Sequence, residues 1–130
     1  MLASDLRALA TSRLEEAKIL LAQSKPDGAA YLCGYAVEMA LKRQICEHLD
    51  WDEYPEYDNR LKSFNTHNLL MLLKLAGLEK KAQGATIWVQ WQIIFNWKVE
   101  YRYQAIGSVS SAQAQQMIGA AEKIMIFLGV

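Results

Sequence analysis

The stretch that most constrains the fold is residues 27–49, which reads as one long helix with two different faces. At 3.6 residues per turn, four small side chains fall in one row and allow another helix to approach closely. This row contains Ala29, Cys33, Ala36 and Ala40. The opposite row contains Tyr31, Gly34, Leu41, Ile45 and Leu49, with Glu38 in its middle. Because an unpaired carboxylate in an apolar stripe is costly, we expect a cation beside Glu38.

Two partners for Glu38 stay open from the sequence. Lys42 lies four residues further along the same helix, where it would make an ordinary surface pair. Alternatively, a cation reaches Glu38 from elsewhere in the fold, and Arg102 is the candidate. We predict that Glu38 lies in the interior or at an interface and contacts Arg102 or a ring hydroxyl.

Three further segments have clear helical signals. Residues 4–24 carry a leucine stripe and begin with Ser4 as a predicted cap, and a short turn joins them to the central helix. Residues 66–77 are leucine-rich, begin at Thr66 as a predicted cap and stop at Gly77. The last helix begins with a capping box, and its apolar residues recur every three or four positions. The capping box pairs Ser110 with Gln113, and the apolar series is Ala114, Met117, Ala121, Ile124 and Leu128.

Residues 85–103 are ambiguous between helix and strand. Their β-branched and aromatic side chains favour a strand by propensity, but the large apolar residues keep helical spacing. An isolated strand would have no partner in this chain, so we predict a helix that ends near Trp97.

Residues 49–65 read as a long connection rich in acids and aromatics. The acids are Asp50, Asp52, Glu53, Glu56 and Asp58, and the aromatics are Trp51, Tyr54 and Tyr57. The acids are expected to form a solvated surface, while the aromatics could anchor the connection on the bundle or on a partner.

The composition agrees with one compact helical domain over residues 1–130. Hydrophobic residues make up 52% of the chain and only two prolines occur. We therefore predict an all-α protein, an up-and-down antiparallel bundle of four to five helices. The 14 basic residues balance the 14 acidic ones, so bulk charge does not favour a polyanionic partner.

The compartment is predicted from the cysteines and from the lack of targeting signals. Cys33 and Cys46 are thirteen residues apart on one predicted helix, about 20 Å, which is beyond disulfide reach. Thiols that cannot pair are typical of a reducing compartment. The chain shows no signal peptide and no membrane-spanning stretch, so we expect a cytoplasmic protein.

The sequence lacks the motifs of most common catalytic and ligand-binding sites. The glycines are scattered rather than gathered in a phosphate loop, and His48 and His67 are the only histidines, so we expect no metal and no cofactor. What remains is the segment 97–103, which sets cations among aromatic rings just before the last helix. Its candidate ligand-binding residues are Lys98, Tyr101, Arg102 and Tyr103, together with Glu38. Arg102 either satisfies Glu38 inside the bundle or stands at the mouth of an anion site, where it stacks on a ring and contacts a carboxylate or phosphate.

The sequence resembles the HEPN domain proteins of prokaryotes. The resemblance rests on DGAAY leading into GYAVEMALK at residues 27–42, on the TH-N-L run at 66–69, and on the aromatic segment with Arg102 and Tyr103. It covers nearly the whole chain and implies a helical bundle that is commonly dimeric. Family members often occur beside minimal nucleotidyltransferases in toxin–antitoxin pairs. Many are metal-independent ribonucleases that use an arginine followed, after four to six residues, by a histidine.

This chain departs from that motif because no histidine follows Arg102. A formal match exists between Arg60 and His67, but it precedes the third helix, and we interpret it as a coincidence. His67 corresponds better to the family's helix-three histidine, whose ordinary role is capping or packing. Without a well-placed histidine, the usual general acid–base group is missing.

We therefore expect a non-catalytic interaction module that forms a homodimer and pairs with a minimal nucleotidyltransferase. The dimer contact is expected near residues 88–103 and part of the central helix, where large apolar side chains would otherwise face water. The alternatives are a ribonuclease toxin with a degenerate site built on Arg102, Glu38 and His67, and the binding of RNA, a nucleotide or another small anion at Arg102.

Overall fold

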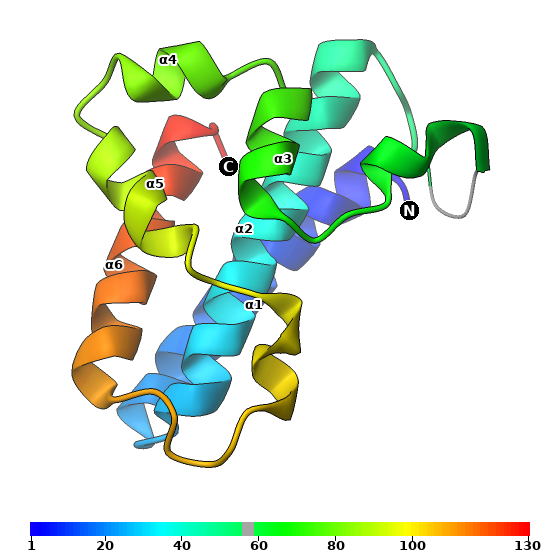
Figure 1. Ribbon diagram of the computed structural model, residues 1–130. Coiled ribbons are helices and arrows are strands. Elements are labelled where there is room, and N and C mark those ends of the chain that lie inside the picture. The colour runs from blue at the N-terminus through cyan, green and yellow to red at the C-terminus, as the bar shows by residue number, and fades with distance from the viewer. Residues whose placement is uncertain (56–58) are drawn as a thin grey trace.

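The computed structural model describes residues 1–55 and 59–130, and in that part of the chain helices are joined by turns and short irregular segments (Figure 1). Its six α-helices are α1 (Ala3–Ala22), α2 (Pro26–Leu49), α3 (Leu69–Leu75), α4 (Glu79–Gln83), α5 (Trp88–Ile94) and α6 (Ser111–Phe127). Two 3-10 helices, η1 (Asn59–Phe64) and η2 (Val99–Tyr103), lie in the connections. The all-α bundle is thus confirmed, although it has six helices where four to five were predicted.

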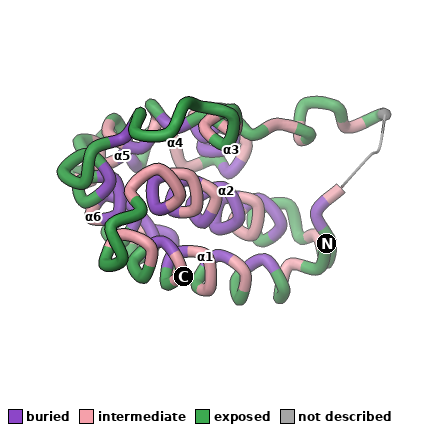
Figure 2. Tube along the Cα trace, turned by 90° about the horizontal axis from the view of Figure 1, so that it is seen from below, coloured by how far each residue is buried: buried purple, intermediate pink, exposed green. Residues whose placement is uncertain are grey.

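Helix α2 runs through the middle of the molecule. Figure 2 shows α1 on one side of it and the α3–α5 region on the other, with the buried positions concentrated on α2 between them. Helix α6 packs against α2, α1 and α5. The small row predicted on α2, Ala29, Cys33, Ala36 and Ala40, is fully buried. Of the opposite row, Gly34, Glu38, Leu41 and Ile45 are buried, Tyr31 is partly buried and Leu49 is exposed. Helix α2 is therefore the element on which the other helices assemble.

Two of the predicted helix caps are wrong. Helix α1 begins after Leu2 with no side-chain cap, so Ser4 does not cap it. Helix α3 is capped by Asn68, whose side chain accepts a hydrogen bond from Met71 N, and Thr66 lies two residues earlier. The capping box of Ser110 and Gln113 at the start of α6 is confirmed.

The choice of helix over strand for residues 85–97 is confirmed, but the helical region is divided. Helix α4 was not predicted, and α5 ends at Ile94, earlier than the expected end near Trp97. Within the described residues, every helix is too short or too polar to cross a lipid bilayer.

The connection after α2 is fastened to the N-terminus. Ala3 N donates to Asp52 O, and Tyr54 N donates to Met1 O, both at 2.9 Å. Tyr54 is buried and its hydroxyl donates to Phe64 O. Glu56, Tyr57 and Asp58, which belong to the predicted acidic and aromatic surface, lie outside the described residues.

The large aromatic residues that suggested a dimer are mostly buried by the chain itself. Trp91 and Trp97 lie in the core, Trp88 and Phe95 pack partly against it, and Leu69, Leu72 and Leu73 of α3 are buried. The predicted surplus of apolar surface on this segment is therefore wrong. The homodimer stays a prediction that needs a different argument.

Candidate functional site

Glu38 is fully buried on α2, as predicted, but its partners differ from the predicted one. Its Oε1 lies 2.7 Å from Nδ1 of His67, and its Oε2 lies 3.5 Å from Nζ of Lys42. The expected contact with Arg102 is wrong, because the histidine before α3 reaches the carboxylate instead. The helical pair with Lys42 exists, but it lies in the interior and not on the surface.

His67 is held in place by the turn that leads into α3. Asn68 N donates to Oγ1 of Thr66 at 3.1 Å, and Asn68 in turn caps α3 through a 2.9 Å bond from Met71 N. Both flanking residues thus fix the backbone around the imidazole. The His67 side chain is about half exposed (51%), while the Glu38 side chain that it meets is buried. One side of the His67 ring therefore contacts a buried carboxylate, while the rest of the ring is exposed to solvent.

Lys42 and Tyr54 complete the surroundings of the carboxylate. The Lys42 ammonium lies 5.1 Å from the centroid of the Tyr54 ring, a cation–π distance. Burial, followed by the nearby charges of Cys46 and Glu38, raises the pKa of Tyr54, so its hydroxyl stays protonated at neutral pH. The Oε2 atom of Glu38 accepts no hydrogen bond from the described residues.

Two cavities meet at His67. The first, of about 380 Å³, is lined by Glu38, Lys42, Tyr54 and His67 among others. The second, of about 440 Å³, lies on the η2 side and is lined by His67 together with Lys98 and Glu100. Because Nδ1 is bonded to Glu38, the other ring nitrogen, Nε2, is the one available to a molecule in these cavities.

The remaining candidates from the segment 97–103 lie apart from Glu38. Arg102 is exposed on η2, with its guanidinium 4.9 Å from the centroid of the Tyr103 ring. Its interaction with Tyr103, together with a hydrogen bond to Tyr31, raises the pKa of Arg102, and it is charged at any ordinary pH. Tyr101 donates its hydroxyl hydrogen to Asn96 O at 2.7 Å. Small-anion or nucleotide binding at Arg102 stays a prediction.

The structure thus brings Glu38 and His67 together, places Lys98 in the second cavity that His67 also lines, and leaves Arg102, Tyr101 and Tyr103 elsewhere. Sequence reasoning grouped Glu38 and His67 with Arg102 in a degenerate ribonuclease site, but it expected Arg102 and not His67 to contact the carboxylate, and it missed the contribution of Tyr54. One signal was available, since a carboxylate inside an apolar row and a lone histidine just before a helix are both polar groups in need of a partner.

The two thiols are buried in the core. Burial raises the pKa of Cys33 to about 12 and also raises the pKa of Cys46. Thiols of this kind are inert at neutral pH, so neither is a candidate nucleophile.

Comparison with known proteins gives one family and no individual relative. Neither a curated protein nor a solved structure matches the chain. The sequence profile of the HEPN domain matches residues 3–129, which is nearly the full length, and the all-helical fold described above agrees with it. The chain belongs to the HEPN domain family.

Proposed function

We propose that this HEPN protein acts as a non-catalytic binding module, one half of a two-protein system. The observation that carries the proposal is a loop before α6 that is fixed in place yet presents a fully exposed apolar side chain. Ile106 is 100% exposed, and Tyr103 on the same segment is 77% exposed.

The loop is held by Asp27 at the start of α2. Its Oδ2 accepts a hydrogen bond from Gly107 N at 2.7 Å, and its Oδ1 accepts one from Val109 N at 2.9 Å. A backbone fixed in this way loses little entropy when a partner binds. Large apolar and aromatic side chains with an arginine beside them are typical of the residues that dominate protein interfaces.

The partner we propose is a minimal nucleotidyltransferase encoded beside this protein, in a toxin–antitoxin type of pair. Membership of the HEPN family supports this choice, because family members often occur beside minimal nucleotidyltransferases. The balanced charge of the chain also favours a protein partner over a nucleic acid. A non-catalytic role is supported by the lack of a histidine after Arg102. We further propose that two copies of the chain form a homodimer in the cytoplasm.

The test is co-purification with the product of the neighbouring reading frame, followed by titration calorimetry. Ile106→Ser is expected to weaken the complex at least tenfold. The matched control is Met71→Ser, because Met71 is 43% exposed but lies on α3. Failure of the two proteins to bind, or equal effects of both substitutions, would contradict the proposal.

A second candidate is a ribonuclease centred on His67, and the 2.7 Å contact with buried Glu38 favours it. A carboxylate on Nδ1 fixes the tautomer of the ring and leaves the Nε2 lone pair free to accept a proton, which is the arrangement of a general base. In this reaction Nε2 accepts the proton of a ribose 2′-hydroxyl, and the 2′-oxygen attacks the adjacent phosphate. The bond from phosphorus to the 5′-oxygen breaks as a 2′,3′-cyclic phosphate forms, the 5′-oxygen takes a proton from water, and the hydroxide left by that water takes the proton held on Nε2. Lys98 in the neighbouring cavity offers a positive charge to the phosphate.

An RNA cleavage assay in the presence of a chelator separates the two candidates. The ribonuclease candidate requires cleavage that is lost in His67→Asn and kept in His48→Asn, since His48 lies on α2 away from these cavities. No cleavage by the protein, alone or with its partner, leaves the binding module as the function.

A further inference from the structure

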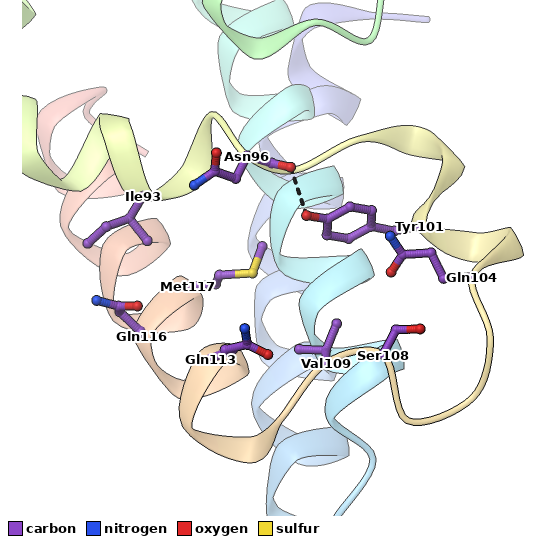
Figure 3. A pocket seen from close by; sticks show the side chains of 9 residues that line it. All are labelled: Ile93, Asn96, Tyr101, Gln104, Ser108, Val109, Gln113, Gln116 and Met117. Atoms are coloured by element: carbon purple, nitrogen blue, oxygen red, sulfur yellow. Dashed lines mark hydrogen bonds between the residues drawn. The ribbon is translucent and has the colours of Figure 1, made fainter.

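A third cavity lies between the end of α5, helix η2 and the first turns of α6 (Figure 3). Its volume is about 260 Å³ and it is open on one side to solvent. It is lined by Ile93, Asn96, Tyr101, Gln104, Ser108, Val109, Gln113, Gln116 and Met117. We refer to it as the amide cleft, and no part of the Glu38–His67 site belongs to it.

The chemistry of the amide cleft is uniform. None of the nine lining side chains carries a charge, and four of them are carboxamides, namely Asn96, Gln104, Gln113 and Gln116. Its floor is apolar, because Met117 and Val109 are buried. Each carboxamide carries an acceptor oxygen beside two donor hydrogens. The cleft therefore suits a ligand that is uncharged and offers both donors and acceptors.

Three polar groups in the cleft are already used by the fold. The Tyr101 hydroxyl donates to Asn96 O, as the dashed line in Figure 3 shows, and Gln113 Oε1 accepts from Ser110 N at 2.9 Å. The Ser108 hydroxyl donates to Ala105 O. These bonds hold the walls in place. The side chains of Asn96, Gln104 and Gln116 make no hydrogen bond to the described part of the chain, so their amide groups are the ones available to a ligand.

We infer that the amide cleft binds a short, extended, uncharged stretch of polypeptide main chain supplied by the partner protein. A peptide backbone alternates N–H donors and C=O acceptors, which the carboxamides can pair, and small side chains can pack on the apolar floor. The volume suits a few residues of extended chain but not a folded element. The inference rests on the proposed function, because it names what the partner brings to this face.

The position of the cleft favours a protein segment over a free small molecule or a nucleic acid. Gln104 and Ser108, which line the rim, stand on either side of Ile106 in the loop held by Asp27. A partner that covers Ile106 therefore contacts the loop that supplies part of the cleft wall. The uncharged lining offers nothing to the phosphates that dominate the binding of nucleic acids.

The experiment selects ligands for the cleft without the natural partner. A library of seven-residue peptides displayed on phage is selected on the purified protein, and the enriched sequences are made as blocked synthetic peptides for titration. The variants are Gln104→Leu and Gln116→Leu, because these side chains hold no part of the fold. The matched control is Gln115→Leu, which changes a neighbouring exposed glutamine of α6 that does not line the cleft.

Enrichment of uncharged peptides that bind at least tenfold more weakly to both variants, with no change in Gln115→Leu, supports the inference. The side-chain amide signals of Asn96, Gln104 and Gln116 should then shift in the NMR spectrum on peptide addition. No enrichment, or equal affinity for all variants, overturns it. Adenosine or uridine that shifts these signals where the peptides do not also overturns it, by assigning the cleft to a nucleobase.

The failures of the two proposals are distinguishable. If the nucleotidyltransferase binds and Ile106→Ser weakens it, but no peptide binds the cleft, the inference falls and the proposed function stands. If peptides bind the cleft but the nucleotidyltransferase does not bind the protein, the proposed function falls and the cleft stands.

Discussion

The indole ring of Trp97 lies directly against the backbone of Gly34, and its Nε1 donates to Tyr31 O at 3.1 Å. A Cβ placed on Gly34 would come within 2.1 Å of the ring. Gly34 thus provides the slot that buries Trp97 on α2, and this contact holds the chain between α5 and η2 on the bundle.

We predict that Gly34→Ala lowers the free energy of unfolding by about 1–3 kcal/mol, because the buried ring must move away. The control is Gly119→Ala on α6, where a Cβ would meet nothing within 4 Å. There the better helix propensity of alanine should stabilise the protein by about 0.5–1 kcal/mol. Urea denaturation of both variants measures the difference, and stabilisation by Gly34→Ala would contradict the packing described.

The second prediction concerns the buried carboxylate. Glu38→Ala should lower the free energy of unfolding on the order of 3 kcal/mol, because it leaves the largely buried Lys42 ammonium without a carboxylate and removes the hydrogen bond to half-exposed His67. Glu47→Ala, which removes an exposed pair with Arg43, should cost about 0.5 kcal/mol. Equal melting temperatures for the two variants would show that Glu38 contributes no more than a surface charge.

The third prediction is a pH dependence at Asp27. Backbone hydrogen bonds from Gly107 and then Val109 hold the pKa of this carboxyl below its usual 3.8. A depressed folded-state pKa contributes stability that is fully present above the unfolded pKa and is lost as the pH falls through the folded one. Asp27→Asn should therefore melt at a lower temperature than the natural protein at pH 7, and the gap should close as the pH falls below 3.8. If the difference in melting temperature between the two proteins is unchanged at pH 2–3, the charge of Asp27 does not contribute to stability.

The fourth prediction is the homodimer. Large apolar side chains remain exposed on several helices, with Ile19 on α1, Val89 on α5 and Ile126 on α6 all more than half exposed. The Lys18–Glu122 ion pair places α1 and α6 side by side, so two of these residues belong to neighbouring helices. Sedimentation at micromolar concentration should give a species about twice 14.8 kDa. A single species near 14.8 kDa would mean that these residues face water.

The sequence was enough to predict the long helices, because their signals are local. The two rows of α2 and the capping box of α6 are set by residues within a few turns of one another. Helices α4 and α5 have only five and seven residues, too few to show a period, and packing sets their ends. Their boundaries were therefore beyond sequence reasoning.

The contacts of the candidate site depend on distant segments, and this is why they were only half predicted. Glu38 could be recognised as a buried carboxylate from its own helix. Its partner His67 is 29 residues away and arrives through a turn that no periodicity describes. In the same way, the burial of Trp97 depends on the missing side chain of Gly34, 63 positions earlier, so the aromatic segment was mistaken for uncovered surface.

The central position of α2 also affects the protein while it is being made. Helix α2 is complete at Leu49, but α6, which packs against it, is complete only at Phe127. At a translation rate of roughly 5–20 residues per second, this side of α2 lacks its natural cover for about 4–16 seconds. A nascent chain that stalls before Ser111 therefore displays a long apolar helix surface to chaperones and proteases, and premature termination of this message should yield fragments that the cell removes rather than accumulates.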